Sequence, residues 1–255
     1  MQLLDIYNPF GAPVFYEETV DSTMTLSREL ASQAHPHGTV IAADFQEAGR
    51  GRVPGRPWET EKGKVLAFTV LLRYPQSQDI PPALTLRSGL AVSLAIEDFL
   101  PALRGLAQIK WPNDIMLRQG KVCGILTEAE GGNVHIGIGV NFAQKEFPAH
   151  LQNKAVSIAL AAGIDIEAQA RFSLLEKILQ RLHEALILTD SDAWRRPIEE
   201  RLYKKGERVN FAEGIAGSRQ IVTGCLTGIG SDGELLLMTD KAEQPLAFFS
   251  GELQF

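Results

Sequence analysis

Apolar residues along this chain follow two spacings, and each spacing predicts a different element. Continuous apolar runs rich in β-branched and aromatic residues indicate buried strands over residues 38–45 and 64–74. Apolar residues that return every three or four positions predict helices over residues 20–34, 81–100 and 165–188. Strands and helices therefore alternate through the first two thirds of the chain, which indicates a sheet packed on helices.

The boundaries of these helices carry their own signals. Asp21 and Ser22 are N-cap candidates for the first helix, because their side-chain oxygens can accept from its free backbone N–H groups. A further helix is expected over residues 191–203. Pro197 lies inside it and removes a backbone donor, so we expect a kink or a break there.

The second half of the chain is richer in strands. Residues 108–142 predict two or three strands joined by hairpins, with glycine-containing turns. After Lys205 the apolar runs become short and are separated by Gly, Ser and Asp turns, which is typical of a small all-β module. We therefore predict an α+β fold, a mixed β-sheet packed against helices, with a main domain over residues 1–204 and a C-terminal β domain over residues 205–255.

Composition and charge restrict the function. The chain has 255 residues, 45% of them hydrophobic, which fits a globular protein with a sizeable core. A net charge of −6 with scattered Lys and Arg argues against a general nucleic-acid binder. No signal peptide and no bilayer-length apolar run is evident, so we expect a cytoplasmic protein with no membrane partner. Cys123 and Cys225 are too few for a metal cage or a disulfide framework, and reduced thiols are expected.

One basic segment stands out against this acidic background. Residues 47–58 read EAGRGRVPGRPW, and their glycines and prolines disfavour both helix and strand, so Arg50, Arg52 and Arg56 must project from a loop, called here the Arg loop. Guanidinium groups bind phosphate or carboxylate oxygens in pairs, and glycines let backbone N–H groups approach the same anion. A solvated, mobile loop is the alternative. We expect an anionic ligand at this loop.

Two further segments carry candidate chemistry. In KWPND, Lys110, Asn113 and Asp114 surround a proline, and Lys121 follows at the start of KVCGIL. A lysine beside a carboxylate at strand edges suits charge neutralisation during displacement at a phosphoryl group, although Lys110 can equally be a surface charge. The glycines of GIGVNF, residues 137–142, indicate close approach of a ligand, with a bulge or a tight helix contact as the alternative.

Taken together, the motifs DST, GRGR, KWPND, KVCGIL and GIGVN resemble those of the biotin-protein ligases in order and approximate spacing. The resemblance implies the biotin/lipoate ligase catalytic fold, which is similar to that of class II aminoacyl-tRNA synthetases, followed by a small SH3-like β-barrel. It implies ATP-dependent, AMP-forming activation of biotin to biotinyl-5′-AMP. The biotinyl group would then pass to a lysine of a biotin carboxyl carrier domain, with Mg²⁺ as cofactor.

The resemblance also implies roles for single residues. Catalytic roles fall on Lys121, Arg50, Arg52 and Asp114, and Asp114 is in addition a candidate Mg²⁺ ligand. Biotin contacts are implied for Ser22, Thr23, Gln46 and Gly124. Nucleotide contacts are implied for Arg50, Arg52, Trp58, Lys110, Asn113 and Asn141. The Arg loop would fold over the adenylate and exclude water.

Some features depart from the family pattern or leave alternatives. Met24 stands where many relatives have Asn, and the Arg loop is one residue longer than the common form. Because DST begins at Asp21, we expect no N-terminal DNA-binding domain and no nucleic-acid partner, and either a monomer or a homodimer. A lipoate or octanoate ligase of the same superfamily is the first alternative. A non-catalytic sensor of biotin or nucleotide is the second.

Overall fold

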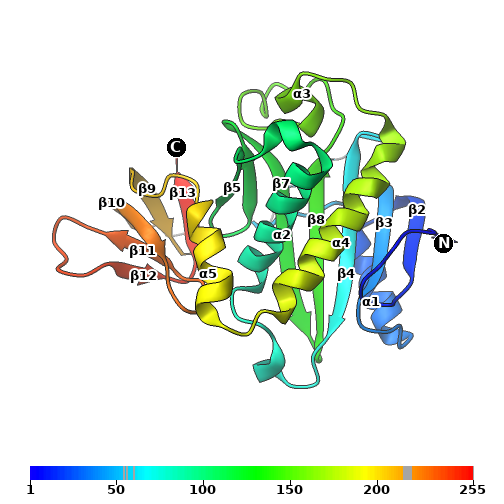
Figure 1. Cartoon of the computed structure of the whole chain (residues 1–255), viewed down its shortest axis with the longest axis horizontal. Helices are drawn as coiled ribbons and strands as arrows, with labels where there is room; N and C mark the ends of the chain where they lie inside the picture. Colours follow the sequence, from blue (N-terminus) through cyan, green and yellow to red (C-terminus); the bar gives the residue numbers. More distant parts are fainter. Residues whose placement is uncertain (54, 56, 60, 215–219, 255) are drawn as a thin grey trace.

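The main part of the molecule is an eight-stranded sheet in the order β1-β2-β3-β4-β8-β7-β6-β5 (Figure 1). This computed structural model describes the chain except for residues 54, 56, 60, 215–219 and 255, so Arg56 lies outside the described residues. β2 and β3 pair in parallel and the other neighbours are antiparallel, which confirms the predicted mixed sheet. The strands are β1 (Gln2–Leu3), β2 (Val14–Val20), β3 (Thr39–Gln46), β4 (Val65–Arg73), β5 (Ala107–Lys110), β6 (Asp114–Leu117), β7 (Gly120–Glu130) and β8 (Asn133–Asn141).

Helices cover both faces of this sheet. α2 and α4 pack on each other and on one face, where the alternate strand residues Phe68, Val70 and Ile138 are buried in the core (Figure 1). α1 packs against β3, β4 and β8 from the other face, where Thr69 hydrogen-bonds Thr23. The helices are α1 (Thr23–Ser32), α2 (Leu84–Phe99), α3 (Ile158–Ala162), α4 (Arg171–Ile187) and α5 (Ser191–Glu200), with 3₁₀ turns at Ser77–Asp79, Pro101–Leu103 and Ala168–Ala170.

The helix boundaries follow the predicted signals with two differences. Ser22 is the N-cap of α1, and its hydroxyl accepts from the Met24 N–H at 3.2 Å. α4 begins at Arg171 rather than at residue 165 because a 3₁₀ turn precedes it. α5 runs through Pro197 without a break. Its two apolar anchors, Trp194 and Ile198, are both buried, so packing offsets the hydrogen bond that the proline removes.

The segment over residues 108–142 holds four strands where two or three were predicted. Lys110 pairs with Asp114, so the chain reverses within the three residues around Pro112 and divides one apparent strand into β5 and β6. Trp111 in this reversal is buried, and its indole N–H donates to the Gly233 carbonyl at 2.9 Å. The reversal therefore joins the main sheet to the C-terminal part of the chain.

The C-terminal residues form a five-stranded antiparallel sheet of their own, in the order β12-β11-β10-β9-β13 (Figure 1). Phe211 packs against Phe248 and against Trp111 of the main part. Within the residues that the structure describes, the edge strands β12 and β13 do not pair, so the all-β character is confirmed and a closed barrel is not. The strands are β9 (Arg208–Glu213), β10 (Gln220–Ile229), β11 (Leu235–Met238), β12 (Leu246–Phe248) and β13 (Gly251–Gln254).

Among the helices of the described chain, none combines the length and the apolar composition needed to cross a bilayer.

Candidate functional site

Two adjoining pockets open beside the Arg loop. The inner pocket has a volume of about 60 Å³ and lies between α1, the loop, and strands β7 and β8. The outer cavity has a volume of about 840 Å³ and extends from the same loop toward β13. Residues shared by the two walls are Gly51, Arg52, Trp58, Asn113 and Lys121. A ligand with two parts can therefore occupy both spaces and pass these shared residues.

Glycines make the floor of the inner pocket. Gly124 of β7 pairs with Gly139 of β8, and Gly137 follows two positions along on the same face. A Cβ atom on Gly139 would lie 2.4 Å from the Trp58 ring, and one on Gly137 would lie 2.9 Å from the Met24 sulfur. The sequence predicts that a ligand comes close to these glycines. In the structure the side chains of Trp58 and Met24 lie against the strand backbone at Gly139 and Gly137.

A β-bulge places Lys121 over this floor. The register of β6 and β7 shifts between Ile115 and Met116, so Val122 is an extra residue on β7. Lys121 and Gly124 are three positions apart and would face opposite sides of a regular strand, yet a Cβ on Gly124 would lie 3.2 Å from the Lys121 Nζ. The bulge therefore turns the ammonium group into the pocket.

The ammonium group of Lys121 has one carboxylate partner. Its Nζ lies 2.6 Å from Asp114 Oδ1, and it lies 5.7 Å from the centre of the Trp58 ring. Both members of the pair are partly shielded from solvent, which strengthens their attraction relative to a surface pair. Asp114 thus fixes the position of the ammonium group, and Arg52 in the same wall adds the positive charge that makes this end suited to an anion.

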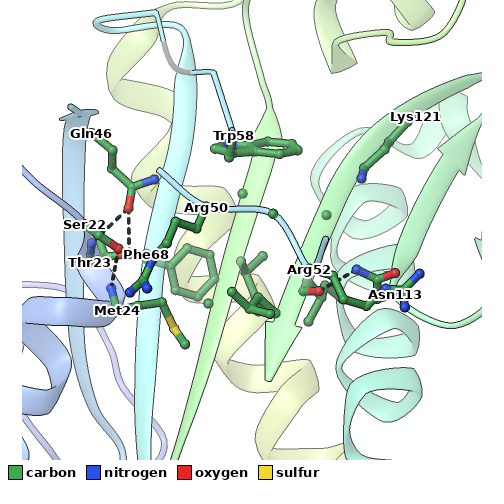
Figure 2. A pocket seen from close by; sticks show the side chains of 17 residues that line it. Ser22, Thr23, Met24, Gln46, Arg50, Arg52, Trp58, Phe68, Asn113 and Lys121 are labelled. Atoms are coloured by element: carbon green, nitrogen blue, oxygen red, sulfur yellow. Dashed lines mark hydrogen bonds between the residues drawn. The ribbon is translucent and has the colours of Figure 1, made fainter. Parts of the chain in front are cut away.

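The opposite end of the inner pocket is neutral and polar. Gln46 Oε1 accepts from the Thr23 N–H at 2.9 Å and from the Thr23 hydroxyl at 3.1 Å. The Thr69 hydroxyl in turn donates to Thr23 Oγ1 at 2.8 Å, so these side chains are fixed by one another. Figure 2 shows Ser22, Thr23 and Gln46 on one side of the pocket and Lys121 and Asn113 on the other. The site is suited to a ligand with an uncharged polar group at one end and an anionic group at the other.

The Arg loop closes over the space between the two ends. It folds back on itself through an isolated bridge between Arg50 and Pro57 and a 2.9 Å hydrogen bond from the Trp58 N–H to the Gly49 carbonyl. In Figure 2 the Arg50 side chain extends from the loop toward the end of the pocket that Thr23 and Met24 line. Arg52 donates to the Gly251 carbonyl of β13 at 3.0 Å. The loop thus contacts the C-terminal sheet as well as the pocket.

Trp58 carries an unused donor. Its Nε1 is buried and has no hydrogen-bond partner among the described residues. A buried N–H without an acceptor costs free energy, about 1–3 kcal/mol, that a ligand oxygen or nitrogen can recover. The indole therefore presents both a flat apolar surface and one donor to whatever binds.

The predicted site residues are brought together with one exception. Lys110 lies at the end of β5 and is not part of either pocket wall in the described chain, so its placement lends no support to a nucleotide contact. Asn113 lines both pockets, although its amide N–H already donates to the Ile125 carbonyl at 2.8 Å. The remaining predicted residues line a wall: Ser22, Thr23, Gln46, Arg50, Arg52, Trp58, Lys121 and Gly124 the inner pocket, and Asp114 and Asn141 the outer cavity.

One wall of the outer cavity consists of residues that no sequence motif indicates. Residues 144–155, which connect β8 toward α3, supply much of this wall, here called the outer-wall segment. His150 of this segment lies 3.2 Å from Glu59, directly after the Arg loop. The segment has no regular strand or helix and no repeated spacing, so neither periodicity nor a motif marked it. Its members in the wall are Gln144, Glu146, Phe147, Pro148, His150, Leu151, Lys154 and Ala155.

The cysteine nearest the site is not a nucleophile. Cys123 lies on the core side of β7, fully buried, and this burial raises the pKa of its thiol well above the usual range. A thioester to this residue would require the thiolate to form in an apolar core. The site therefore offers an ammonium and guanidinium groups rather than a thiolate.

Alkylation tests this conclusion. We expect iodoacetamide at pH 8 to leave Cys123 unmodified in the folded protein and to react only at Cys225, which is half-buried. Peptide mass mapping of native and urea-unfolded samples measures this, with the unfolded sample as the control in which both thiols react. Alkylation of Cys123 in the native protein, with loss of activity, would contradict it.

Few side chains at this site could act as ligands to a metal ion. Across the described chain, no three His, Cys, Asp or Glu side chains gather as a metal cluster. Asp114 is the one predicted metal ligand, and its carboxylate is paired with Lys121. Such a site fits Mg²⁺ that arrives on phosphate oxygens and takes one protein carboxylate, since Mg²⁺ keeps several waters and seldom needs an all-protein cage.

Comparison with known proteins gives a consistent set of similarities. Residues 16–142 match the family model described as the biotin/lipoate A/B protein ligase family. A biotin–[acetyl-CoA-carboxylase] ligase of Paracoccus denitrificans is 31% identical over 246 residues, which are 91% of this chain and 98% of that protein. The bifunctional ligase/repressor of Bacillus spizizenii is 37% identical over 181 residues, and the match covers 66% of this chain and 52% of the relative. The chain thus matches about half the length of that relative.

A solved structure agrees over nearly the whole chain. The biotin protein ligase from Aquifex aeolicus, in complex with biotin and ATP, superposes with a TM-score of 0.78 at 29% identity. The match covers 94% of this chain and 97% of that one.

Proposed function

Because this chain belongs to the biotin/lipoate A/B protein ligase family, we propose that it is a biotin-protein ligase. It activates biotin with ATP to biotinyl-5′-AMP and transfers the biotinyl group to a lysine of a biotin carboxyl carrier domain. The observation that carries this proposal is the two-ended inner pocket, with neutral hydrogen-bonding groups at one end and Lys121 at the other. Biotin matches it, since it has a neutral urea on an apolar bicycle and a carboxylate at the end of its chain.

In the first step, a biotin carboxylate oxygen forms a bond to the α-phosphorus of ATP, and the bond from that phosphorus to the bridging oxygen breaks to release pyrophosphate. Both reactants are anions and repel each other. Lys121 and Arg52 lie in the wall that the two pockets share, and Arg50 lines the inner pocket; their positive charges reduce this repulsion. Their charges also stabilise the negative charge that develops on the departing pyrophosphate.

In the second step, the neutral amine of the acceptor lysine attacks the acyl carbon, AMP leaves, and the amine loses a proton. Asp114 is the carboxylate beside the reacting end of the pocket and is the residue proposed to orient the amine. Bound Mg²⁺ would supply positive charge on the phosphate oxygens, with Asp114 as its candidate protein ligand.

The Arg loop is proposed to retain the activated intermediate. Acyl-adenylates react with water, so a loop that covers the site protects the product of the first step. Arg52 is the residue that ties the described loop to β13. Retention therefore depends on a contact between the loop and the C-terminal sheet.

Removing this contact has an expected result. In Arg52→Ala, biotinyl-5′-AMP should escape into solution several times faster than from the unmodified protein, because the guanidinium no longer holds the loop or the phosphate. Release is measured by trapping free adenylate after a single turnover without acceptor. Arg195→Ala is the matched control, since that guanidinium lies on α5 and pairs with Asp192. An unchanged release rate in Arg52→Ala would show that the contact between Arg52 and β13 does not retain the adenylate.

The proposal also covers the domain boundaries, the binding partner, the cellular location and the oligomeric state. We propose a division into a catalytic domain over residues 1–204 and a C-terminal domain over residues 205–255, supported by the separate sheets. The partner is a carrier domain rather than nucleic acid, in keeping with the negative net charge. A cytoplasmic location and a monomer or homodimer complete the proposal.

Transfer to a carrier domain tests the whole proposed function. Purified protein, ATP, Mg²⁺ and biotin should add one biotinyl group to a biotin carboxyl carrier domain. Intact mass spectrometry detects the added mass, and a carrier with its acceptor lysine replaced by Arg is the control. If the unmodified carrier gains no mass while biotin and ATP are consumed, the transfer step is wrong.

A further inference from the structure

Two side-chain amides in the outer cavity form a chain of hydrogen bonds that starts at the Lys121 backbone. Asn141 Nδ2 donates to the Lys121 carbonyl at 3.2 Å, and Gln144 Nε2 donates to Asn141 Oδ1 at 3.1 Å. Both amide residues are 5% exposed. Gln144 Oε1 is also buried, and it has no hydrogen-bond partner among the described residues.

The direction of this chain is fixed by its first member. A backbone carbonyl can only accept, so Asn141 must turn its Nδ2 toward Lys121 and its Oδ1 toward Gln144. Gln144 must then turn its Nε2 toward Asn141, which leaves Oε1 as the unused group. Rotating the Gln144 amide would bring two oxygens together and break the chain, so the Oε1 position is fixed as an acceptor.

The outer cavity is where the base of a bound nucleotide has room. Lys121 lies in the wall that the two pockets share, so reacting phosphate oxygens belong near that wall. The inner pocket, at about 60 Å³, is far smaller than the outer cavity of about 840 Å³. Gln144 lines the outer cavity, beyond the shared residues.

We propose that Gln144 Oε1 accepts a hydrogen bond from the exocyclic 6-amino group of adenine and so makes the site selective for 6-aminopurine nucleotides. This proposal rests on the proposed function, which requires ATP. A 6-oxopurine such as hypoxanthine or guanine would place an oxygen against the Gln144 oxygen. Because the amide cannot rotate, that mismatch leaves two buried acceptors unsatisfied, which disfavours binding.

The test compares three triphosphates on two proteins. We assay the unmodified protein and Gln144→Met with ATP, inosine triphosphate and purine riboside triphosphate. The last of these lacks any substituent at position 6 of the purine. In the unmodified protein, ATP should exceed purine riboside triphosphate in kcat/KM for pyrophosphate exchange by on the order of tenfold, as one buried hydrogen bond predicts. In Gln144→Met this ratio should fall toward one, and inosine triphosphate should gain relative to ATP.

A ratio that stays the same in Gln144→Met would overturn the proposal and would indicate that a water satisfies the Gln144 oxygen instead. Gln152→Met is the matched control, because it makes the same change in the outer-wall segment at an exposed residue outside both pocket walls. Calorimetric affinities for the same nucleotides, with and without biotin, give the ratio independently of exchange. Absence of exchange with biotin contradicts the proposed function, whereas the affinity ratio decides the role of Gln144.

Discussion

Replacing Lys121 with Ala should slow formation of biotinyl-5′-AMP by about a hundredfold or more, while the protein stays folded. Groups aimed at charge that develops in a transition state typically contribute factors of this size. The β-bulge directs Lys121 over Gly124, and Asp114 holds its ammonium group at 2.6 Å. Rapid-quench measurement of adenylate formation in a single turnover isolates this step from transfer and product release.

The control for this variant is Lys145→Ala, which removes an exposed lysine that pairs with Asp165. That pair lies at the surface, where solvent screens the attraction, and it is outside both pocket walls, so adenylation should continue at the original rate. Thermal unfolding of Lys121→Ala checks that the fold is retained. Adenylation within threefold of the unmodified rate would take Lys121 out of the mechanism.

Replacing Gly139 with Val should weaken biotin binding by on the order of a hundredfold, the upper end of the 1–3 kcal/mol cost of overpacking. A Cβ at Gly139 already lies 2.4 Å from the Trp58 ring, and the branched side chain would fill the floor of the inner pocket. Valine is a favourable strand residue, so the pairing of β8 with β4 and β7 should persist. Calorimetric titration with biotin measures the effect.

The circular dichroism spectrum and the thermal midpoint of Gly139→Val separate a filled pocket from a misfolded sheet. A folded variant that binds biotin within threefold of the original affinity would show that the pocket floor is elsewhere. A further readout is the fluorescence of Trp58, which should shift because the indole must leave the bare backbone of Gly139.

Much of the fold could be predicted because local signals and packing agree. Ser22 caps α1, the apolar runs of β3 and β4 are buried, and the helical spacing of α2 and α4 matches the core they cover. α5 shows the limit of local rules. Pro197 predicts a kink or break from backbone chemistry alone, whereas burial of Trp194 and Ile198 keeps the helix continuous.

The candidate site could be predicted where short motifs carry it and not where distant segments meet. DST, GRGR and KVCGIL supplied most of the inner pocket because each places its polar residues at an element boundary. The outer-wall segment has no such motif, and its relation to Glu59 arises only in the folded chain. The sequence places both Lys110 and Lys121 near the ligand, Lys121 as the catalytic candidate and Lys110 as a nucleotide contact or a surface charge. Only the bulge in β7, which depends on the register with β6, directs Lys121 into the pocket.

The central claim is that this protein activates biotin with ATP. Pyrophosphate exchange into ATP tests that claim most directly. The assay contains purified protein, Mg²⁺ and one of three acids, which are biotin, lipoate and octanoate. The two-ended pocket predicts rapid exchange with biotin and little with the other two acids, because they lack a urea to bind Ser22, Thr23 and Gln46. Exchange that requires lipoate or octanoate, or none with any of the three, would contradict it.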